Sequence, residues 1–315
     1  MQSDMRAVLA PRRVLLYGLA TLWILDGLLQ MQPGMFTMDM VSTIMQPAAT
    51  GEPHWLSAMI NWSIQLTTPH IVAFNWFVIV LQLAIGALLL MPRRRVVKVG
   101  LWLSVAWGLL VFVFGEGAGQ LLTGTATFLS GAPGSVLLYV AASVLLLLEE
   151  QRSWWQGRTV DLATWTVALT LMLGGLLQVS PTFWTALGLA APFGSGAMMP
   201  QPLFIRYSLN SVAALVAASP LVANAVIAVV TLSLGVLLVT NSRSRTVLWA
   251  TVAWLALTWW FGQDVGMLFG GMATDPNTAP VLLLMLFAGW RSRTAALPSA
   301  ESIARAAGVE ASGSW

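Results

Sequence analysis

The sequence predicts an all-α polytopic membrane protein with eight transmembrane helices, arranged as two parallel four-helix repeats. Of its 315 residues, 57% are hydrophobic and only 9% are charged, which is unlike the composition of a soluble domain. Apolar runs of about 20 residues recur along the chain, and each is long enough to cross ~30 Å of hydrocarbon. The chain contains no cysteine, which excludes disulfides, thiol redox chemistry and iron–sulfur clusters.

The expected spans follow one another in two sets of four. They cover residues 14–29, 71–91, 99–114 and 134–148, and then 162–179, 221–240, 246–261 and 281–290. The last span is short, so we expect it to begin inside the preceding loop. Long connections at 30–68 and 181–219 follow the first span of each set, and we expect them to contain amphipathic helices that lie at the membrane interface.

Basic residues determine the expected orientation. One face holds every Lys and Arg except Arg206, whereas the opposite face carries Asp39, Glu52, Glu116, Asp264 and Asp275. Because Lys and Arg favour the cytoplasmic side, both termini are expected in the cytoplasm. In a bacterium this predicts a multi-pass protein of the inner membrane. The positive charge follows from topology and implies no nucleic acid; membrane lipid is the expected partner, and other membrane subunits are an alternative.

A long internal repeat defines the domain organisation. The stretch from Trp107 to Pro133 matches the stretch from Trp254 to Pro280 without a gap. We call residues 115–133 and 262–280 the first and second signature loops. Because each copy contains an even number of spans, both copies enter the membrane from the same side and form parallel repeats. The repeats occupy residues 1–150 and 151–295, and the polar tail at 296–315 is expected in the cytoplasm.

Each half also carries a family-like pattern. The first span closes on Leu25-Asp26-Gly27-Leu28-Leu29, and the second contains LQLAIGALLL and ends at Arg93 before a short basic turn. Span six repeats this pattern as LSLGVLLVTNSRSR. The pattern resembles the DoxX-like family of four-helix membrane proteins, which includes the DoxD-type thiosulfate:quinone oxidoreductase subunits. The resemblance implies four-helix units and a quinone-linked redox role.

Polar residues near the outer face suggest a ligand vestibule between the repeats. Asp26 lies ~20 Å along the first span from Arg13, where a carboxyl must have a partner, face a wet cavity or be protonated. Glu116 and Asp264, one position apart in the repeat, are flanked by glycines whose backbone amides can approach an ion. The candidate vestibule residues are Asp26, Glu116, Gln120, Thr123, Asp264, Thr274 and Asp275. Helix packing by a neutral Asp26, and ordinary acidity of exterior loops, are the alternative interpretations.

A second candidate site uses sulfur and imidazole. Methionines are concentrated in the first outer loop, and both histidines of the chain lie there. Thioether and imidazole ligands together suit Cu(I), so the candidate metal ligands are Met35, Met38, Met40, His54 and His70. Met198, Met199, Met267 and Met272 belong to the same face. The alternative is that these methionines are adaptable apolar filler on interfacial helices.

These patterns favour a non-enzymatic function. Haem is not expected because two outer histidines cannot both face a mid-membrane macrocycle. No nucleotide-binding or zinc-protease motif occurs, and we assign no catalytic residue. The leading hypothesis is binding or passage of a small ligand or metal ion, with Cu(I) favoured, through an outward-facing vestibule. The alternatives are a quinone-linked redox subunit of DoxD type, with Glu116, Gln120 and Tyr139 near the quinone, and a structural or assembly subunit of a larger membrane complex.

Overall fold

All regular structure in the described part of the chain is helical. The computed structural model describes residues 2–148, 159–242 and 244–295, and these ranges contain no strand. Eight helices coincide with the expected spans: α1 (Gln2–Leu29), α5 (Ile71–Leu90), α6 (Arg94–Phe114), α7 (Ser135–Leu148), α8 (Thr159–Leu177), α11 (Pro220–Thr240), α12 (Arg245–Leu257) and α13 (Thr278–Ala295). Apolar runs of this kind form helices because a helix satisfies its own backbone hydrogen bonds. The expected tail at 296–315 lies outside the described residues.

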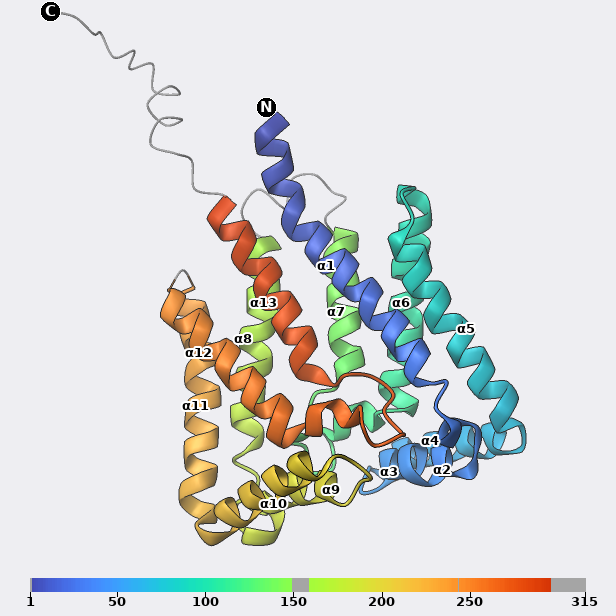
Figure 1. Cartoon of the computed structure of the whole chain (residues 1–315), viewed down its shortest axis with the longest axis vertical. Helices are drawn as coiled ribbons and strands as arrows, with labels where there is room; N and C mark the ends of the chain where they lie inside the picture. Colours follow the sequence, from blue (N-terminus) through green and yellow to red (C-terminus); the bar gives the residue numbers. More distant parts are fainter. Residues whose placement is uncertain (1, 149–158, 243, 296–315) are drawn as a thin grey trace, which may run out of the picture.

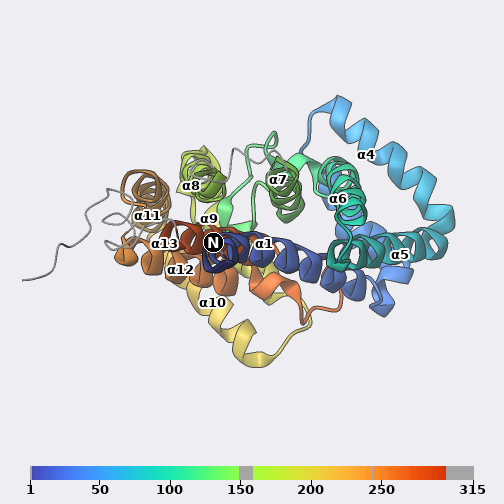
Figure 2. The ribbon, with the colours of Figure 1, turned by 90° about the horizontal axis from the view of Figure 1, so that it is seen from above.

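Within the described residues, three helical segments are both long enough and apolar enough to cross a membrane. They are His54–Leu90, Arg94–Phe114 and Pro220–Thr240, and shorter apolar helices include Ser135–Leu148 and Thr278–Trp290. The first segment holds 37 residues. A straight helix of this length would extend ~55 Å, which exceeds the ~30 Å of a hydrocarbon core. It divides at the turn Thr68–His70 into α4 (His54–Thr67) and α5, and α4 lies at the edge of the molecule beside α5 and α6 (Figure 2).

Most of the remaining helices gather at one end of the molecule, which we call the loop end. They are η1 (Pro33–Phe36), α2 (Met38–Met40), the π-helical turn η2 (Val41–Met45), α3 (Gln46–Ala49), α4, η6 (Pro181–Trp184), α9 (Ala186–Ala197) and α10 (Leu203–Ala218). The N-terminal end of α1 and the C-terminal end of α13 lie at the opposite end (Figure 1). Both long connections therefore fold at the end away from the termini.

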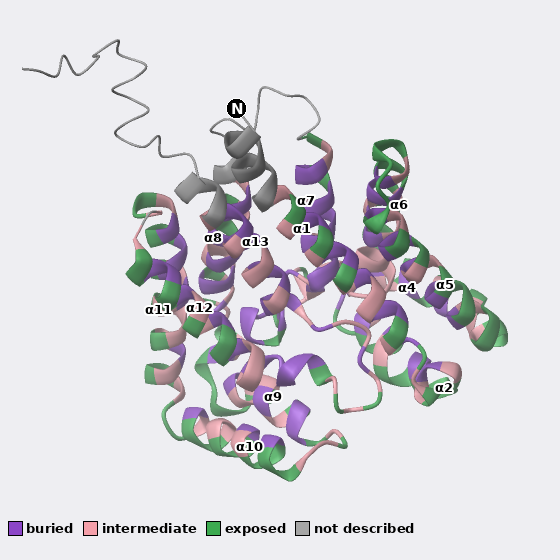
Figure 3. Cartoon of the chain, turned by 45° about the horizontal axis from the view of Figure 1, so that its top comes forward, coloured by how far each residue is buried: buried purple, intermediate pink, exposed green. Residues whose placement is uncertain are grey.

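The core lies where the two halves meet. Helix α13 packs against α1 and α8, and α7 packs against α6, α1 and α8. The main core cluster includes Leu19, Trp23, Tyr139, Leu171 and Leu286, all of which are buried. Buried residues concentrate between these central helices, whereas α5, α10 and α11 expose many apolar side chains on their outer faces (Figure 3).

The same hydrogen bond joins the first two expected spans of each half. Asn75 on α5 donates through Nδ2 to the backbone oxygen of Gln30, at the end of α1, over 2.9 Å. Asn224 on α11 donates in the same way to the backbone oxygen of Gln178, at the end of α8, also over 2.9 Å. Because all four side chains are at most 4% exposed, these bonds fix matching helix pairs in the two halves.

The signature loops share an unusual backbone. Residues 117–120 have φ of 55°, 50°, 68° and 57°, and residues 264–267 have 49°, 52°, 69° and 53°. Each run forms one left-handed turn, which costs roughly 1–2 kcal/mol for each residue that is not glycine. Val265 is the least suited of these residues because its Cβ is branched. The loops diverge after Thr127 and Thr274, and α13 begins at Thr278, inside the second signature loop as expected.

Close packing holds the two turns. A Cβ on Gly119 would overlap the carbonyl oxygen of Pro133, and a Cβ on Gly266 would lie 2.7 Å from the carbonyl oxygen of Pro276. Each turn therefore rests directly on the downstream backbone of its own loop. Gly124 also has a positive φ, of 75°, but a Cβ there would meet nothing within 4 Å.

Replacing Gly119 with alanine is expected to destabilise the protein by about 3 kcal/mol or more, because strain at positive φ adds to backbone overlap. Gly124→Ala is the matched control and should cost only about 1–2 kcal/mol, since it has the strain without the overlap. Thermal unfolding in detergent, followed by tryptophan fluorescence, measures both. Equal losses of stability in the two variants would contradict the packing role of Gly119.

Candidate functional site

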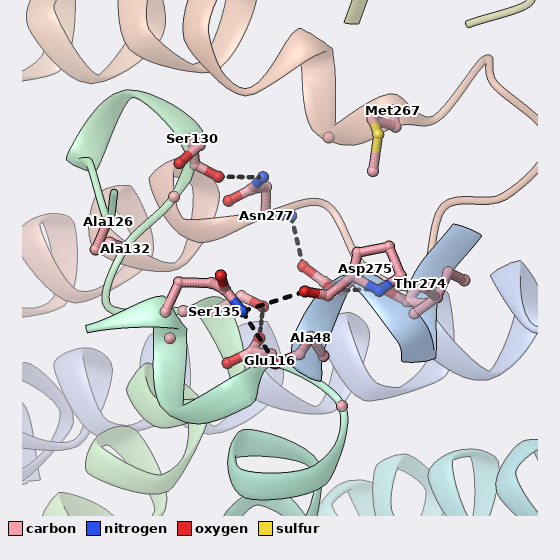
Figure 4. A pocket seen from close by; sticks show the side chains of 18 of the residues that line it. Ala48, Glu116, Ala126, Ser130, Ala132, Ser135, Met267, Thr274, Asp275 and Asn277 are labelled. Carbon is pink, nitrogen blue, oxygen red and sulfur yellow. Dashed lines mark hydrogen bonds between the residues drawn. The ribbon is translucent and has the colours of Figure 1, made fainter. Parts of the chain in front are cut away.

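The two signature loops line one pocket. It has a volume of about 610 Å³ and lies at the loop end, between the first loop, the second loop, η2–α3 and Ser195 of α9 (Figure 4). Its polar and sulfur-containing lining side chains are Thr43, Glu116, Gln120, Thr125, Ser130, Ser135, Ser195, Met267, Met272, Thr274, Asp275 and Asn277. Glu116, Gln120, Thr274 and Asp275 of the expected vestibule are thus brought together.

Glu116 links the end of α6 to the start of α7. Its Oε1 accepts hydrogen bonds from the Oγ of Ser135 (3.1 Å) and the backbone N–H of Val136 (3.3 Å). A carboxyl in this position satisfies free N–H groups at the helix N-terminus. Its Oε2 is buried without a hydrogen-bond partner. Burial raises the pKa of Glu116 to about 8, repulsion by Asp275 adds to the rise, and the bonds from Val136 and Ser135 oppose it.

Asp275 brings the second acid to the pocket. Its Oδ2 accepts a hydrogen bond from the Oγ1 of Thr274 (2.9 Å), and its Oδ1 accepts one from the backbone N–H of Asn277 (2.7 Å). Asn277 in turn donates through Nδ2 to the backbone oxygen of Ser130 on the first loop (3.4 Å). Figure 4 shows Glu116 and Asp275 in the same part of the pocket. The two acids therefore come from different halves.

Asp26 is not among the residues that line the pocket. Its side chain is 1% exposed, and it accepts a hydrogen bond at Oδ1 from the hydroxyl of Tyr139 (3.3 Å). Its carboxyl interacts electrostatically with both Asp275 and Glu116. Acids from α1, the first loop and the second loop thus lie close enough for their charges to interact.

Polar contacts continue from Asp26 into the first half. Trp23 packs edge-on against Tyr139, with ring centroids 5.0 Å apart. Its indole N–H donates to the Oγ of Ser104 (2.8 Å), which is 2.7 Å from the Oγ of Ser143. These buried polar side chains join α1, α6 and α7.

Asp264 does not form the expected pair with Glu116. The counterpart of Glu116 in the gap-free repeat is Gln263, whose Oε1 accepts a hydrogen bond from the backbone N–H of Ala279 at the start of α13 (3.0 Å). Asp264 instead packs against Gly196 of α9 and accepts a hydrogen bond from Gln201. Burial raises the pKa of Asp264 to about 6, and the bond from Gln201 opposes the rise. The left-handed turn directs the side chains of Gln263 and Asp264 apart. Asp264 therefore does not take the place that corresponds to Glu116, which corrects the sequence interpretation.

Thr123 also lies outside the pocket lining. Its Oγ1 donates to the backbone oxygen of Gln120 (2.8 Å) and is 2.7 Å from the Oγ1 of Thr125. Thr125, rather than Thr123, lines the pocket. The role of Thr123 is therefore to order the loop.

The two histidines among the five expected metal ligands lie far apart. His54 begins α4, and His70 ends the helical segment that follows it, so the two imidazoles lie ~24 Å apart along the helix. Met35 is fully buried and Met40 is 6% exposed, whereas Met38 is 54% exposed. Among the described residues, no group of three or more His, Asp or Glu could hold a metal ion. The thioethers at the pocket are instead those of Met267 and Met272.

Sequence reasoning missed several pocket residues, chiefly Ser135, Asn277 and Thr125. Ser135 follows a proline and a glycine directly before an apolar run, which is a recognisable helix start. Asn277 has a positive φ of 68°, which suits asparagine in a tight turn. For Thr125 the sequence offers no signal beyond its membership of the loop.

Comparisons of the chain with family models, curated proteins and solved structures find no match. The relationship to DoxX-like proteins accordingly stays an expectation from the residues quoted above. The pocket and its acids are the remaining basis for assigning a function.

The stability of the protein is expected to fall as pH rises from about 4.5 to about 8. Folded Glu116 holds its proton up to about pH 8, whereas the unfolded chain releases it near the ordinary value of 4.5, so alkaline pH favours unfolding. In Glu116→Gln the melting temperature should decline less over this range. Asp39→Asn, which changes an exposed acid at the same end, is the control. An unchanged slope in Glu116→Gln would contradict the assigned burial.

Proposed function

We propose that this chain is an integral membrane protein that binds a small cationic ligand, or passes it across the membrane, through the pocket between its two halves. The carrying observation is that Glu116 and Asp275, one from each signature loop, line a shared pocket of about 610 Å³, where repulsion by Asp275 opposes the ionisation of Glu116. The described lining residues include no Lys, Arg or His. A bound cation would relieve this repulsion, whereas an anion would increase it.

The size and lining of the pocket support a small ligand. Its volume falls in the range of ~300–1,000 Å³ that is typical of ligand sites. Hydroxyl and amide groups surround the acids, while Ile44, Ala126, Met267 and Met272 supply apolar contacts. This mixture suits an ammonium group on a short apolar body as well as a bare ion.

The proposal includes an eight-span architecture of two parallel four-helix repeats. Matching hydrogen bonds in the halves, matching turns in the loops, and the common position of both terminal helix ends support it (Figure 1). The Lys and Arg distribution then gives a bacterial inner-membrane protein with cytoplasmic termini, and the pocket faces outward.

Helix α4 supports the placement of the loop end at the membrane interface. It buries Leu56, Ile60 and Ile64, and it exposes a second apolar stripe formed by Trp55, Met59, Trp62 and Leu66. Tryptophan-rich apolar faces are typical of helices that lie in the lipid headgroup region. Lipid is therefore the proposed partner of this face.

Binding of small cations to purified protein in nanodiscs tests the proposal. Choline, ethylammonium and spermidine are the cationic probes, with acetate and phosphate as anionic controls. We expect calorimetric binding of at least one cation, weakened at least tenfold in Glu116→Gln and in Asp275→Asn but unchanged in Asp39→Asn. Binding of the anions, or of none of the cations, would refute the proposal.

The same binding assay tests the alternative of a quinone-linked redox role. Glu116 and Gln120 line the pocket as that hypothesis requires. Tyr139 does not line it and instead donates a hydrogen bond to Asp26. Binding of a short-chain ubiquinone in place of the cations would favour the redox role. A structural subunit role stays a third proposal, and the exposed apolar faces of α5 and α11 fit either lipid or neighbouring chains.

Cu(I) is the metal candidate because Met267 and Met272 line the same pocket. Thioether sulfur is a soft ligand that selects Cu(I) over harder ions. If the ion binds there, the double variant Met267→Leu, Met272→Leu should lose most of the copper retained after loading, measured by elemental analysis. Met198→Leu, at an exposed methionine of the same end, is the control. Equal copper content in all three proteins, or none in the parent, would end the copper proposal.

A further inference from the structure

Each signature loop crosses to the opposite half of the molecule. Ser180, which follows α8, donates through Oγ to the backbone oxygen of Gly124 in the first loop (2.6 Å). Gln32, which follows α1, donates through Nε2 to the backbone oxygen of Ala273 in the second loop (3.3 Å). The halves thus contain two equivalent places where a signature loop lies against the end of the first helix of the other half.

These two places have opposite chemistry. At the first, Asp275 of the second loop interacts with Asp26 of α1. At the second, Phe128, the counterpart of Asp275 in the gap-free repeat, packs on Gly174 of α8, the counterpart of Asp26. Glu116 near the first place corresponds to the uncharged Gln263 near the second. Three acids at one place therefore become phenylalanine, glycine and glutamine at the other.

Phe128 leaves no room beside Gly174. A Cβ on Gly174 would lie 2.7 Å from the Cβ of Phe128, and the Phe128 side chain is only 1% exposed. Phe128 belongs to the main core cluster, together with Leu171 and Val281. The ring is thus part of the core, and it occupies the place that corresponds to Asp275 beside Asp26 in the other half.

We propose that the duplicated chain has one ligand site, the acidic niche where Glu116 and Asp275 line the pocket beside the buried Asp26, and that Phe128 permanently fills the equivalent niche beside Gly174. The identity of the ligand as a cation rests on the proposed function. The inference that Phe128 closes the second niche is independent of the proposed function. One cation per chain follows, and positions 128 and 275 determine which niche is open.

Single cysteines test this directly because the natural chain has none. Asp275→Cys and Phe128→Cys place a thiol at the two equivalent positions. In nanodiscs, a cationic methanethiosulfonate reagent should modify Asp275→Cys at least tenfold faster than Phe128→Cys. It should also react there faster than an anionic reagent of similar size. In denaturing detergent the two thiols should react alike, which controls for intrinsic reactivity.

A second pair of cysteine variants, with more conservative substitutions, tests the proposal even if Phe128→Cys misfolds. Thr274 lines the pocket, and its counterpart Thr127 is 1% exposed, so Thr274→Cys should react and Thr127→Cys should be protected. Comparable rates within both pairs in the folded protein would overturn the single-site proposal. So would two bound cations per chain in the calorimetric assay. Protection at positions 127 and 128 without any cation binding would instead refute only the proposed function.

Discussion

The left-handed turn in each signature loop is the constraint on which the pocket depends. In the first half it follows α6, and in the second half it follows the π-helical turn η7 (Thr258–Gly262) at the end of α12. In both it reverses the chain with four consecutive residues at positive φ. Such a turn is costly for Val265 and persists only because the surrounding backbone fixes it. The contact of Gly119 with Pro133 and of Gly266 with Pro276 provides that support. The remainder of each loop is then free to reach the other half and enclose a common cavity.

The all-helical character and the meeting of the loops could be predicted from the sequence for specific reasons. Long apolar runs identify helices, and a gap-free repeat containing Gly115, Gly119 and Gly124 requires equal backbones in its two copies. The partner of Glu116 was not readable in the same way. Asp264 resembles Glu116 in charge, but the strict repeat aligns Glu116 with Gln263, and a left-handed turn directs neighbouring side chains apart. The separation of His54 from His70, two of the expected metal ligands, by the length of α4 was likewise not readable from composition.

Electrostatics distinguishes the pocket from an ordinary packing defect. Three carboxyls approach one another from α1, the first loop and the second loop, and each interacts unfavourably with its neighbours. Hydrogen bonds from Tyr139, Ser135 and Thr274 satisfy only part of their capacity, and the Oε2 of Glu116 is buried without a partner. Acids in such surroundings are stabilised by protons or by a bound cation. Selection for stability alone would favour the apolar filling seen around Phe128.

The contrast between scaffold and niche positions carries the functional argument further. Asn75 and Asn224 make the same bond in each half, and the two turns have nearly the same dihedral angles, so the duplicated scaffold is preserved where packing requires it. The differences occur at Asp26 and Asp275, whose counterparts in the repeat are Gly174 and Phe128. A symmetric scaffold with one apolar and one acidic niche needs the acidic niche for something other than stability. An attraction for cations is the property that these acids supply and that the filled niche lacks.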